Sequence, residues 1–448
     1  MRDEDMDREA RHPEARGSEG SDDLAAWLRL LLTPGLGPPV QRRLLAVFGL
    51  PQEVFAAPTP ALAGEAAALS PAQIRALRHP PARLDSLVEA TEAWLAAGVT
   101  PSGRTRRVIT LADADYPPAL LEAHDPPLLL FAQGRPLAHG PLAWPPALAV
   151  VGSRNATPQG VANARAFSRH LAAQGWTVVS GLALGIDGAA HEGAIAGAAD
   201  RASSRAGTGS ERPQQDAPEP QSEALATVAV VGTGLDRVYP SQHEGLAQRI
   251  AQQGLMLSEF PLGTPPLREN FPRRNRIIAA LARGTLVVEA APQSGSLITA
   301  RLAAELGREV FAIPGSIHAP QSRGCHALIR QGAKLVETAE DVLEELGCAV
   351  PLSAARSARG TPEANKAHAS HEARDAHEAD DENDAHDGPE AMQDPVLHAL
   401  GWEPAGLDEL LARTGLPAAR LQARLLELEL AGHLGRLPGS YFQRVGRG

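Results

Sequence analysis

Residues 147–174 read ALAVVGSRNATPQGVANARAFSRHLAAQ, a short apolar run, then a loop of small and polar residues, then a segment with helical composition. Apolar runs of five or six residues that alternate with helices are typical of strands in a parallel sheet covered on both faces. Thr157 and Pro158 mark the start of the helix, because threonine caps helix N-termini and proline favours the first helical position. This stretch therefore predicts one strand–loop–helix unit of a doubly wound sheet.

The same unit recurs along the chain between residues 101 and 350. This repetition predicts a Rossmann-like α/β domain with a doubly wound parallel sheet. The predicted strands include 147–152, 177–181, 227–232, 284–290 and 309–315. The predicted helices are 158–174, 187–197, 241–253, 296–306 and 322–331.

The flanking segments predict further parts of the chain. They are a disordered tail over 1–22, a helical module of the SAM or helix-hairpin-helix type over 23–100, a disordered insertion at 199–226, an acidic disordered linker over 351–394, and a winged-helix-like domain over 395–448. The glycine turn of the helical module suits either DNA contact or plain packing. For the winged helix, contact with DNA and contact with protein are equally compatible with its sequence.

Composition sets limits on location and partners. The formal net charge is −11, but the acidic residues concentrate in the predicted tail, insertion and linker, so the folded parts can still bind an anion. Two cysteines exclude a disulfide scaffold and a cysteine-rich zinc site. The acidic N-terminus has no apolar secretory region, and no apolar run reaches membrane-spanning length. We expect a cytoplasmic protein without a membrane partner.

Four loops rich in glycine or serine follow predicted strands, at 152–160, 180–187, 232–236 and 293–300. In a doubly wound sheet, ligands bind outside the carboxyl ends of the strands, where such loops offer backbone N–H groups to a phosphate. The chain has neither a P-loop nor a G-x-G-x-x-G fingerprint. We therefore expect an anion-binding edge and no bound cofactor.

Residues 267–276, LRENFPRRNR, place four arginines around Phe271 at the start of a predicted helix. The helix dipole opposes cations at this position, so a structural anion or a bound ligand should offset the cost. Guanidinium groups suit phosphate oxygens, and an aromatic ring can stack on a base. The sequence leaves open whether Phe271 stacks on a ligand or is buried.

Catalytic candidates near these loops are Asp187, His191, Asp236, His243, Glu259 and Glu289. None has the spacing of metal ligands or of a nucleophile elbow. We expect His191 to pack inside the fold rather than to transfer protons. We expect Asp187 to cap a helix rather than to act as a general base. We expect Cys325 to be a semi-buried thiol rather than a nucleophile. We predict no catalytic residue and no metal site.

Five stretches resemble the bacterial DNA-processing protein A family, also called DprA or Smf. They are VGSRNATPQG, VVSGLALGIDGAAHEGAI, VGTGLDRVYP, the run from LSEFPLGTPPLRENFPRRNR to SLITARLA, and REVFAIPGSIHAPQSRGCHALIRQGAKLVET. The resemblance covers roughly residues 108–346. One departure is Leu184, which stands in the SGLALGID loop where the family commonly has a basic residue.

The resemblance implies a non-enzymatic protein that binds single-stranded DNA, forms a homodimer and helps load the RecA recombinase during natural transformation. It implies DNA contacts at Arg154 and along LRENFPRRNR, and the glycine loops complete the predicted site. The predicted DNA-binding residues are Gly152, Ser153, Arg154, Ser180, Gly181, Gly232, Gly234, Arg268, Asn270, Phe271, Arg273, Arg274, Asn275, Arg276, Ser294, Gly295 and Ser296. The alternatives are a Rossmann-like nucleotide phosphoribohydrolase and a regulator that reads duplex DNA through the winged helix.

Overall fold

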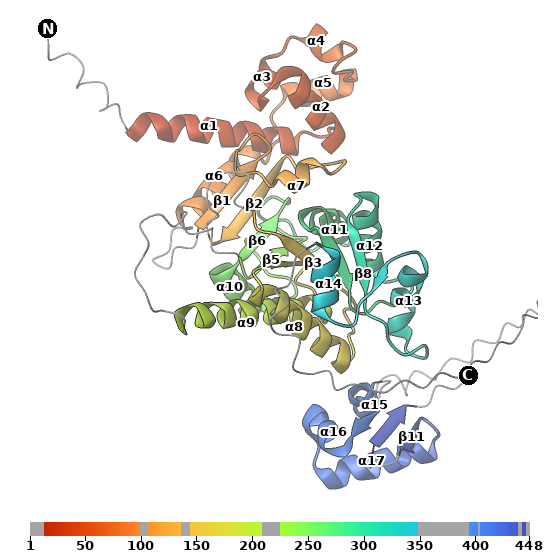
Figure 1. Ribbon diagram of the computed structural model, residues 1–448. Coiled ribbons are helices and arrows are strands. Elements are labelled where there is room, and N and C mark those ends of the chain that lie inside the picture. Colours follow the sequence, from red (N-terminus) through yellow and green to blue (C-terminus); the bar gives the residue numbers. More distant parts are fainter. Residues whose placement is uncertain are drawn as a thin grey trace, which may run out of the picture. The chain divides into compact units, whose positions relative to one another are not determined.

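The computed structural model describes residues 13–98, 105–135, 144–207, 225–347, 394–401, 404–437 and 441–444. The chain divides into two compact units, Met1–Glu337 and Thr338–Gly448 (Figure 1). Nearly all of the predicted acidic linker, most of the predicted insertion and residues 1–12 of the predicted tail lie outside the described ranges.

The larger unit is built on one nine-stranded sheet with the order β1-β2-β6-β5-β4-β3-β7-β8-β9. Strands β3 to β9 run parallel, while β2 is antiparallel to both β1 and β6. The doubly wound prediction is therefore confirmed, with an antiparallel pair added at one edge. The strands are β1 (Thr105–Thr110), β2 (Leu129–Gly134), β3 (Ala147–Val151), β4 (Thr177–Ser180), β5 (Thr227–Val230), β6 (Leu255–Ser258), β7 (Gly284–Val287), β8 (Glu309–Ala312) and β9 (Lys334–Leu335).

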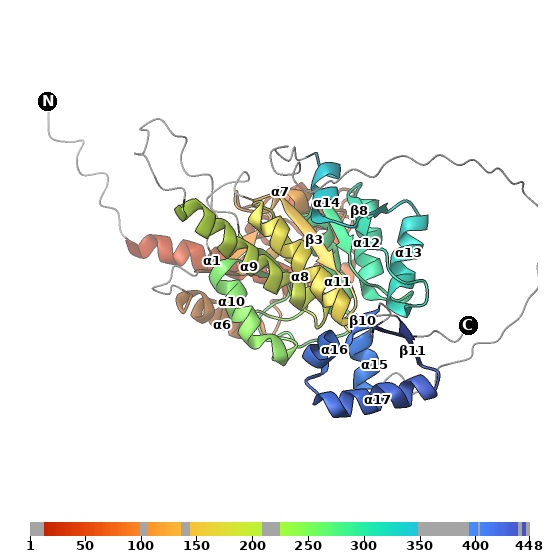
Figure 2. The same ribbon diagram turned by 60° about the horizontal axis from the view of Figure 1, so that its bottom comes forward.

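Helices cover both faces of this sheet. Helices α8, α9 and α10 pack together, while α11 packs on α12 and α13 contacts β8 (Figure 2). Helix α9 continues to Gly207, into the predicted insertion, and an Arg169–Asp200 ion pair of 2.6 Å ties this extension to α8. The helices are α7 (Pro118–Leu121), α8 (Pro158–Ala173), α9 (Ile186–Gly207), η2 (Ser241–His243), α10 (Glu244–Gln253), α11 (Asn270–Leu281), α12 (Gly295–Glu305), η3 (Pro320–Ser322) and α13 (Arg323–Arg330).

The N-terminal module is helical, as predicted, and packs on the antiparallel edge of the sheet. Trp27, Trp94 and Phe131 belong to one buried cluster, and the rings of Trp94 and Phe131 lie 6.1 Å apart, edge to face. Helix α1 begins at Pro13, inside the segment predicted to be disordered. The helices are α1 (Pro13–Leu32), α2 (Pro38–Phe48), α3 (Pro51–Ala56), α4 (Thr59–Ala63), α5 (Pro71–Arg78) and α6 (Leu84–Ala96).

The smaller unit contains the predicted helix–turn–helix followed by two strands. Leu410, Leu421, Leu425 and Phe442 form the centre of its apolar core. A three-stranded sheet with the order β10-β12-β11 completes a winged helix. The winged helix comprises α15 (Pro395–Leu400), β10 (Ala405–Gly406), α16 (Leu407–Thr414), α17 (Ala418–Leu430), β11 (Leu434–Leu437) and β12 (Tyr441–Arg444), and the smaller unit also includes α14 (Ala339–Glu345).

Arginines on helix α17 are the candidates for DNA contact in this unit. Arg424 forms ion pairs with Asp394 at 2.6 Å and with Glu427 at 2.5 Å. Arg420 is exposed on the same helix. Because Arg424 already has two carboxylate partners, the helix offers less free positive charge than its sequence suggests.

Among the described residues, no helix is both long and apolar enough to cross a bilayer.

Candidate nucleic-acid interface

The candidate site lies at the carboxyl ends of the parallel strands. From β3 the chain proceeds through β4, β5 and β6 on one side, and then crosses back to β7 on the other side of β3. Such a reversal opens a crevice at the strand ends where doubly wound proteins bind ligands. We call the loops at 152–157, 181–185, 231–238, 259–268 and 288–295 the strand-end site.

Helix α11 ties the loops of the strand-end site together. The side-chain amide of Asn270 donates to the Gly232 carbonyl at 3.0 Å, and that of Asn275 donates to the Gly295 carbonyl at 3.3 Å. Arg274 donates to the carbonyls of Gly181 and Val230, the latter at 2.6 Å. Side chains of the arginine-rich segment therefore hold the loops of the strand-end site together.

Arg274 is buried, with 4% of its surface exposed. Burial lowers the pKa of its guanidinium to about 10, although the nearby Asp187 carboxylate, 3.9 Å away, opposes this shift. A Cβ added at Gly181 would overlap the guanidinium, so only glycine admits this packing. The side chain does not reach the surface, which differs from the predicted contact with DNA.

Arg276 is also held by carboxylates. It pairs with Glu259 at 2.5 Å and with Asp125 at 2.8 Å. Burial raises the pKa of Glu259, and Arg276 opposes that shift. Asp187 and Glu259 are therefore the structural anions that the sequence required at this helix start. Asp187 is in α9 and Glu259 follows β6, so neither lies at helical spacing from these arginines and residue spacing did not reveal them.

Three arginines of the site remain exposed: Arg154, Arg268 and Arg273. None forms an ion pair with any residue in the described ranges. The guanidinium of Arg154 lies 5.3 Å from the centre of the Phe271 ring. That of Arg273 lies 5.2 Å from the Phe260 ring.

Phe271 is half-buried and lies beside a second aromatic ring that the sequence analysis missed. The centres of the Phe271 and Tyr239 rings are 5.7 Å apart, and Tyr239 is 46% exposed. The sequence did contain a signal for Tyr239 as a site residue, because it stands in a strand-end loop of a chain with few aromatic residues. Arg154, Phe271 and Tyr239 thus form a row of one arginine and two aromatic side chains.

The glycine loops are largely occupied by carboxylates of the chain itself. Asp187 accepts hydrogen bonds from the backbone N–H groups of Gly181 and Ala183, at 3.2 and 3.3 Å. Glu289 accepts from the backbone N–H of Thr157 at 3.0 Å, at the start of α8. These loops hold their shape without a bound phosphate.

The predicted serines have structural partners. The Ser180 hydroxyl donates to the Val150 carbonyl at 2.6 Å, and Ser153 accepts from the Asn155 N–H at 3.1 Å. Ser294 caps α12 and shares a hydrogen bond with Ser296 at 2.7 Å. Close packing restricts three of the glycines, since a Cβ would collide with Ile186 at Gly152, with Pro261 at Gly234, and come within 3.2 Å of Phe271 at Gly232.

The remaining polar candidates also have structural partners. Asp236 accepts from the Gly263 N–H at 2.9 Å, and His243 hydrogen-bonds to the Leu182 carbonyl at 3.0 Å. Cys325 is buried, and burial raises the pKa of its thiol to about 12. Leu184 is 40% exposed within its loop.

His191 is fully buried, with Nδ1 2.7 Å from the Thr227 hydroxyl. That hydroxyl donates to the Val178 carbonyl at 2.6 Å, so it accepts from the Nδ1–H of a neutral imidazole. Burial, followed by the charges of His243 and Arg274, lowers the pKa of His191 to about 3. The residue packs inside the fold.

This pKa predicts a pH dependence of stability. Below about pH 6.5 the unfolded chain takes up a proton that folded His191 does not accept until about pH 3. As the pH is lowered through that window, this residue alone should reduce the free energy of unfolding by about 1.4 kcal/mol for each pH unit. His191→Leu should remove this part of the slope, measured by urea unfolding between pH 7 and 4.5. Parallel curves for the parent and the variant would contradict it.

Together these features define a Rossmann-like α/β protein with a helical N-terminal module, an arginine-lined and aromatic-lined strand edge, and a winged helix. The family model for DNA recombination-mediator protein A matches residues 107–347, and the model for the DprA winged helix domain matches residues 380–440. The chain belongs to the DNA recombination-mediator protein A family.

Individual relatives agree with this assignment. The chain is 32% identical to Protein Smf of Synechocystis sp., over 95% of this chain and 99% of the relative. It is 39% identical to Protein Smf of Escherichia coli, over 74% and 75%. The X-ray structure of DNA processing protein A from Streptococcus pneumoniae is similar with a TM-score of 0.50 and 32% identity, covering 72% of this chain and 97% of that one.

Proposed function

We propose that this protein binds single-stranded DNA at the strand-end site. The observation that carries the proposal is the row formed by exposed Arg154, half-buried Phe271 and exposed Tyr239, with exposed Arg273 over the buried Phe260 ring beside it. Single strands combine regularly spaced phosphates with unpaired bases that stack on aromatic rings. A row of arginine and aromatic side chains matches both features.

The predicted site residues divide into two groups under this proposal. Arg154, Arg268 and Arg273 contact phosphates, and Phe271 stacks on a base together with Tyr239. Arg274, Arg276, Asn270 and Asn275 hold the loops in place from α11, as do the predicted glycines and serines. A rigid set of loops lowers the entropy cost of ordering a flexible strand.

The role that we infer is mediation rather than catalysis. The protein helps load the RecA recombinase on single-stranded DNA during natural transformation, acts as a homodimer and works in the cytoplasm. Membership of a recombination-mediator family supports this inference. So do the carboxylates of the site: Asp187 and Glu259 are engaged with Arg274 and Arg276 and are not poised as an acid–base pair.

The test is fluorescence anisotropy of a labelled single-stranded oligonucleotide across a salt series, with duplex DNA as competitor. We expect tight binding of the single strand, weak competition by the duplex, and affinity that falls steeply with salt because phosphate contacts release counterions. No binding at low salt, or equal competition by duplex, would overturn the proposal.

A further inference from the structure

A cleft extends from loop 259–268 of the strand-end site toward the N-terminal module, where the module meets the loop after β6. It measures about 470 Å³, within the range of about 300–1,000 Å³ typical of small-molecule sites. Leu31 and Leu32 of α1 line one wall, and Phe260 and Leu262 line the other. The strand-end proposal uses Arg273 over Phe260 at this cleft, but neither Arg83 nor the leucines of α1.

The cleft is continuous with the strand-end site. Asn270 and Arg273 of helix α11 belong to the lining of the cleft and also to the predicted DNA-binding residues. A strand that contacts Arg273 is therefore at the mouth of the cleft. Leu31, Leu32 and Leu262 pack against one apolar cluster shared by the module and the sheet, so the two walls are held together.

Two guanidinium groups flank the cleft. Arg83 comes from the turn before α6, Arg273 comes from α11, and both side chains are exposed. Neither forms an ion pair with a residue in the described ranges. The charge of Arg273 acts on Glu259, but neither guanidinium has a carboxylate within ion-pair distance, so both can donate forked hydrogen bonds to a phosphate.

The interior of the cleft suits a base. Its walls combine the apolar side chains of Leu31, Leu32 and Leu262 with polar groups, and Glu259, which lines it, has one carboxylate oxygen, Oε1, that is buried without a hydrogen-bond partner. Oε2 pairs with Arg276. Every DNA base carries an N–H donor on its Watson–Crick edge, and only a single strand leaves that donor free.

We propose that this cleft holds an additional nucleotide of the bound single strand, with its phosphate between Arg83 and Arg273 and its base against Leu31, Leu32 and Glu259. The inference rests on the proposed function, and adds that the N-terminal module is part of the DNA-binding surface. With the Glu259 carboxylate turned toward the cleft, the Watson–Crick edge of the base donates to Oε1, which has no hydrogen-bond partner in the free protein. The acceptor thus favours single strands over duplexes without selecting a sequence.

The test is a length series of labelled oligothymidylates bound to the full chain and to Arg83→Ala. We expect Arg83→Ala to bind the shortest oligonucleotides as the parent does, to lose about tenfold in affinity for longer ones, and to reduce the salt slope there by about 0.7. Arg75→Ala is the matched control, because Arg75 is an exposed arginine of the same module outside the cleft. Arg83→Lys should recover part of the loss.

A second measurement addresses the base. In oligonucleotides of N3-methylthymidine the N3–H donor is absent, so the gain in affinity from short to long oligonucleotides should disappear for the parent. Equal affinities of the parent and Arg83→Ala at every length would overturn the cleft proposal and leave the strand-end site intact. A gain that survives N3-methylation would overturn the base contact. Failure of the parent to bind any oligonucleotide would instead overturn the proposed function.

Discussion

Replacing Arg274 by methionine should lower the free energy of unfolding of the larger unit by about 3–5 kcal/mol. The substitution leaves the Asp187 carboxylate buried without its cationic neighbour, and it leaves the Gly181 and Val230 carbonyls without their donor. A buried charge stripped of its partner is among the costliest single changes in a folded protein. Methionine keeps most of the side-chain volume, so the cost reports charge and hydrogen bonding.

The measurement is urea unfolding followed by tryptophan fluorescence, since Trp27, Trp94, Trp144 and Trp176 all lie in the larger unit. The double variant Arg274→Met with Asp187→Asn should recover part of the loss, because it removes the unpaired charge. Arg273→Ala is the neighbouring control and should change stability by less than about 0.5 kcal/mol, as expected for an exposed side chain. A small effect at Arg274, equal to that at Arg273, would contradict the structural role.

The sequence predicted the strand–loop–helix units because their signals are local. Thr157 and Pro158 begin α8 where expected, and the five predicted strands occur within one to three residues of their predicted ends. Strands β1, β2, β6 and β9 were not among the predicted strands. The extension of α9 was missed because a tertiary ion pair, Arg169 with Asp200, supports residues of weak helical pattern.

The location of the site was also predictable, because parallel strands place the loops that follow them at one edge. The roles of the individual arginines were not. Four arginines in one segment look equivalent in sequence, yet Arg274 and Arg276 point toward Asp187 and Glu259, which follow other strands. Only the three-dimensional arrangement separates buried arginines from those that face solvent. Tyr239 joins the site for the same reason, through contact with Phe271.

Changing Arg154, Arg268 and Arg273 together to alanine should nearly abolish single-strand binding while leaving the fold intact. These three arginines are exposed, and none has an ion-pair partner within the described ranges. A hydrogen bond to a charged group contributes about 1.5–3 kcal/mol, so each substitution should cost about tenfold in affinity. Each should also reduce the slope of log affinity against log salt by about 0.7, since one fewer counterion is released.

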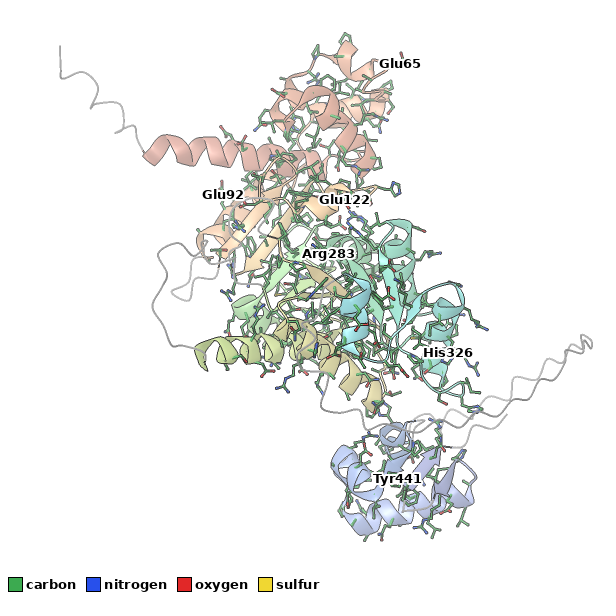
Figure 3. All side chains as sticks on the ribbon, viewed as in Figure 1. Glu65, Glu92, Glu122, Arg283, His326 and Tyr441 are labelled. Atoms are coloured by element: carbon green, nitrogen blue, oxygen red, sulfur yellow. The ribbon has the colours of Figure 1, made fainter. Side chains whose placement is uncertain are left out.

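The matched control carries the same change of net charge elsewhere, at Arg75, Arg283 and Arg330. Arg283 (labelled in Figure 3) and Arg330 lie where the chain enters β7 and approaches β9, at the amino ends of the strands, opposite the proposed site. Anisotropy titrations of both triple variants distinguish a local site from a general charge effect. If the control lost as much affinity as the site variant, long-range attraction would explain the binding and the strand-end site would be wrong. Unchanged binding by the site variant would exclude these arginines as phosphate contacts, whereas loss confined to that variant would place the strand at Arg154, Arg268 and Arg273, beside the Phe271 ring.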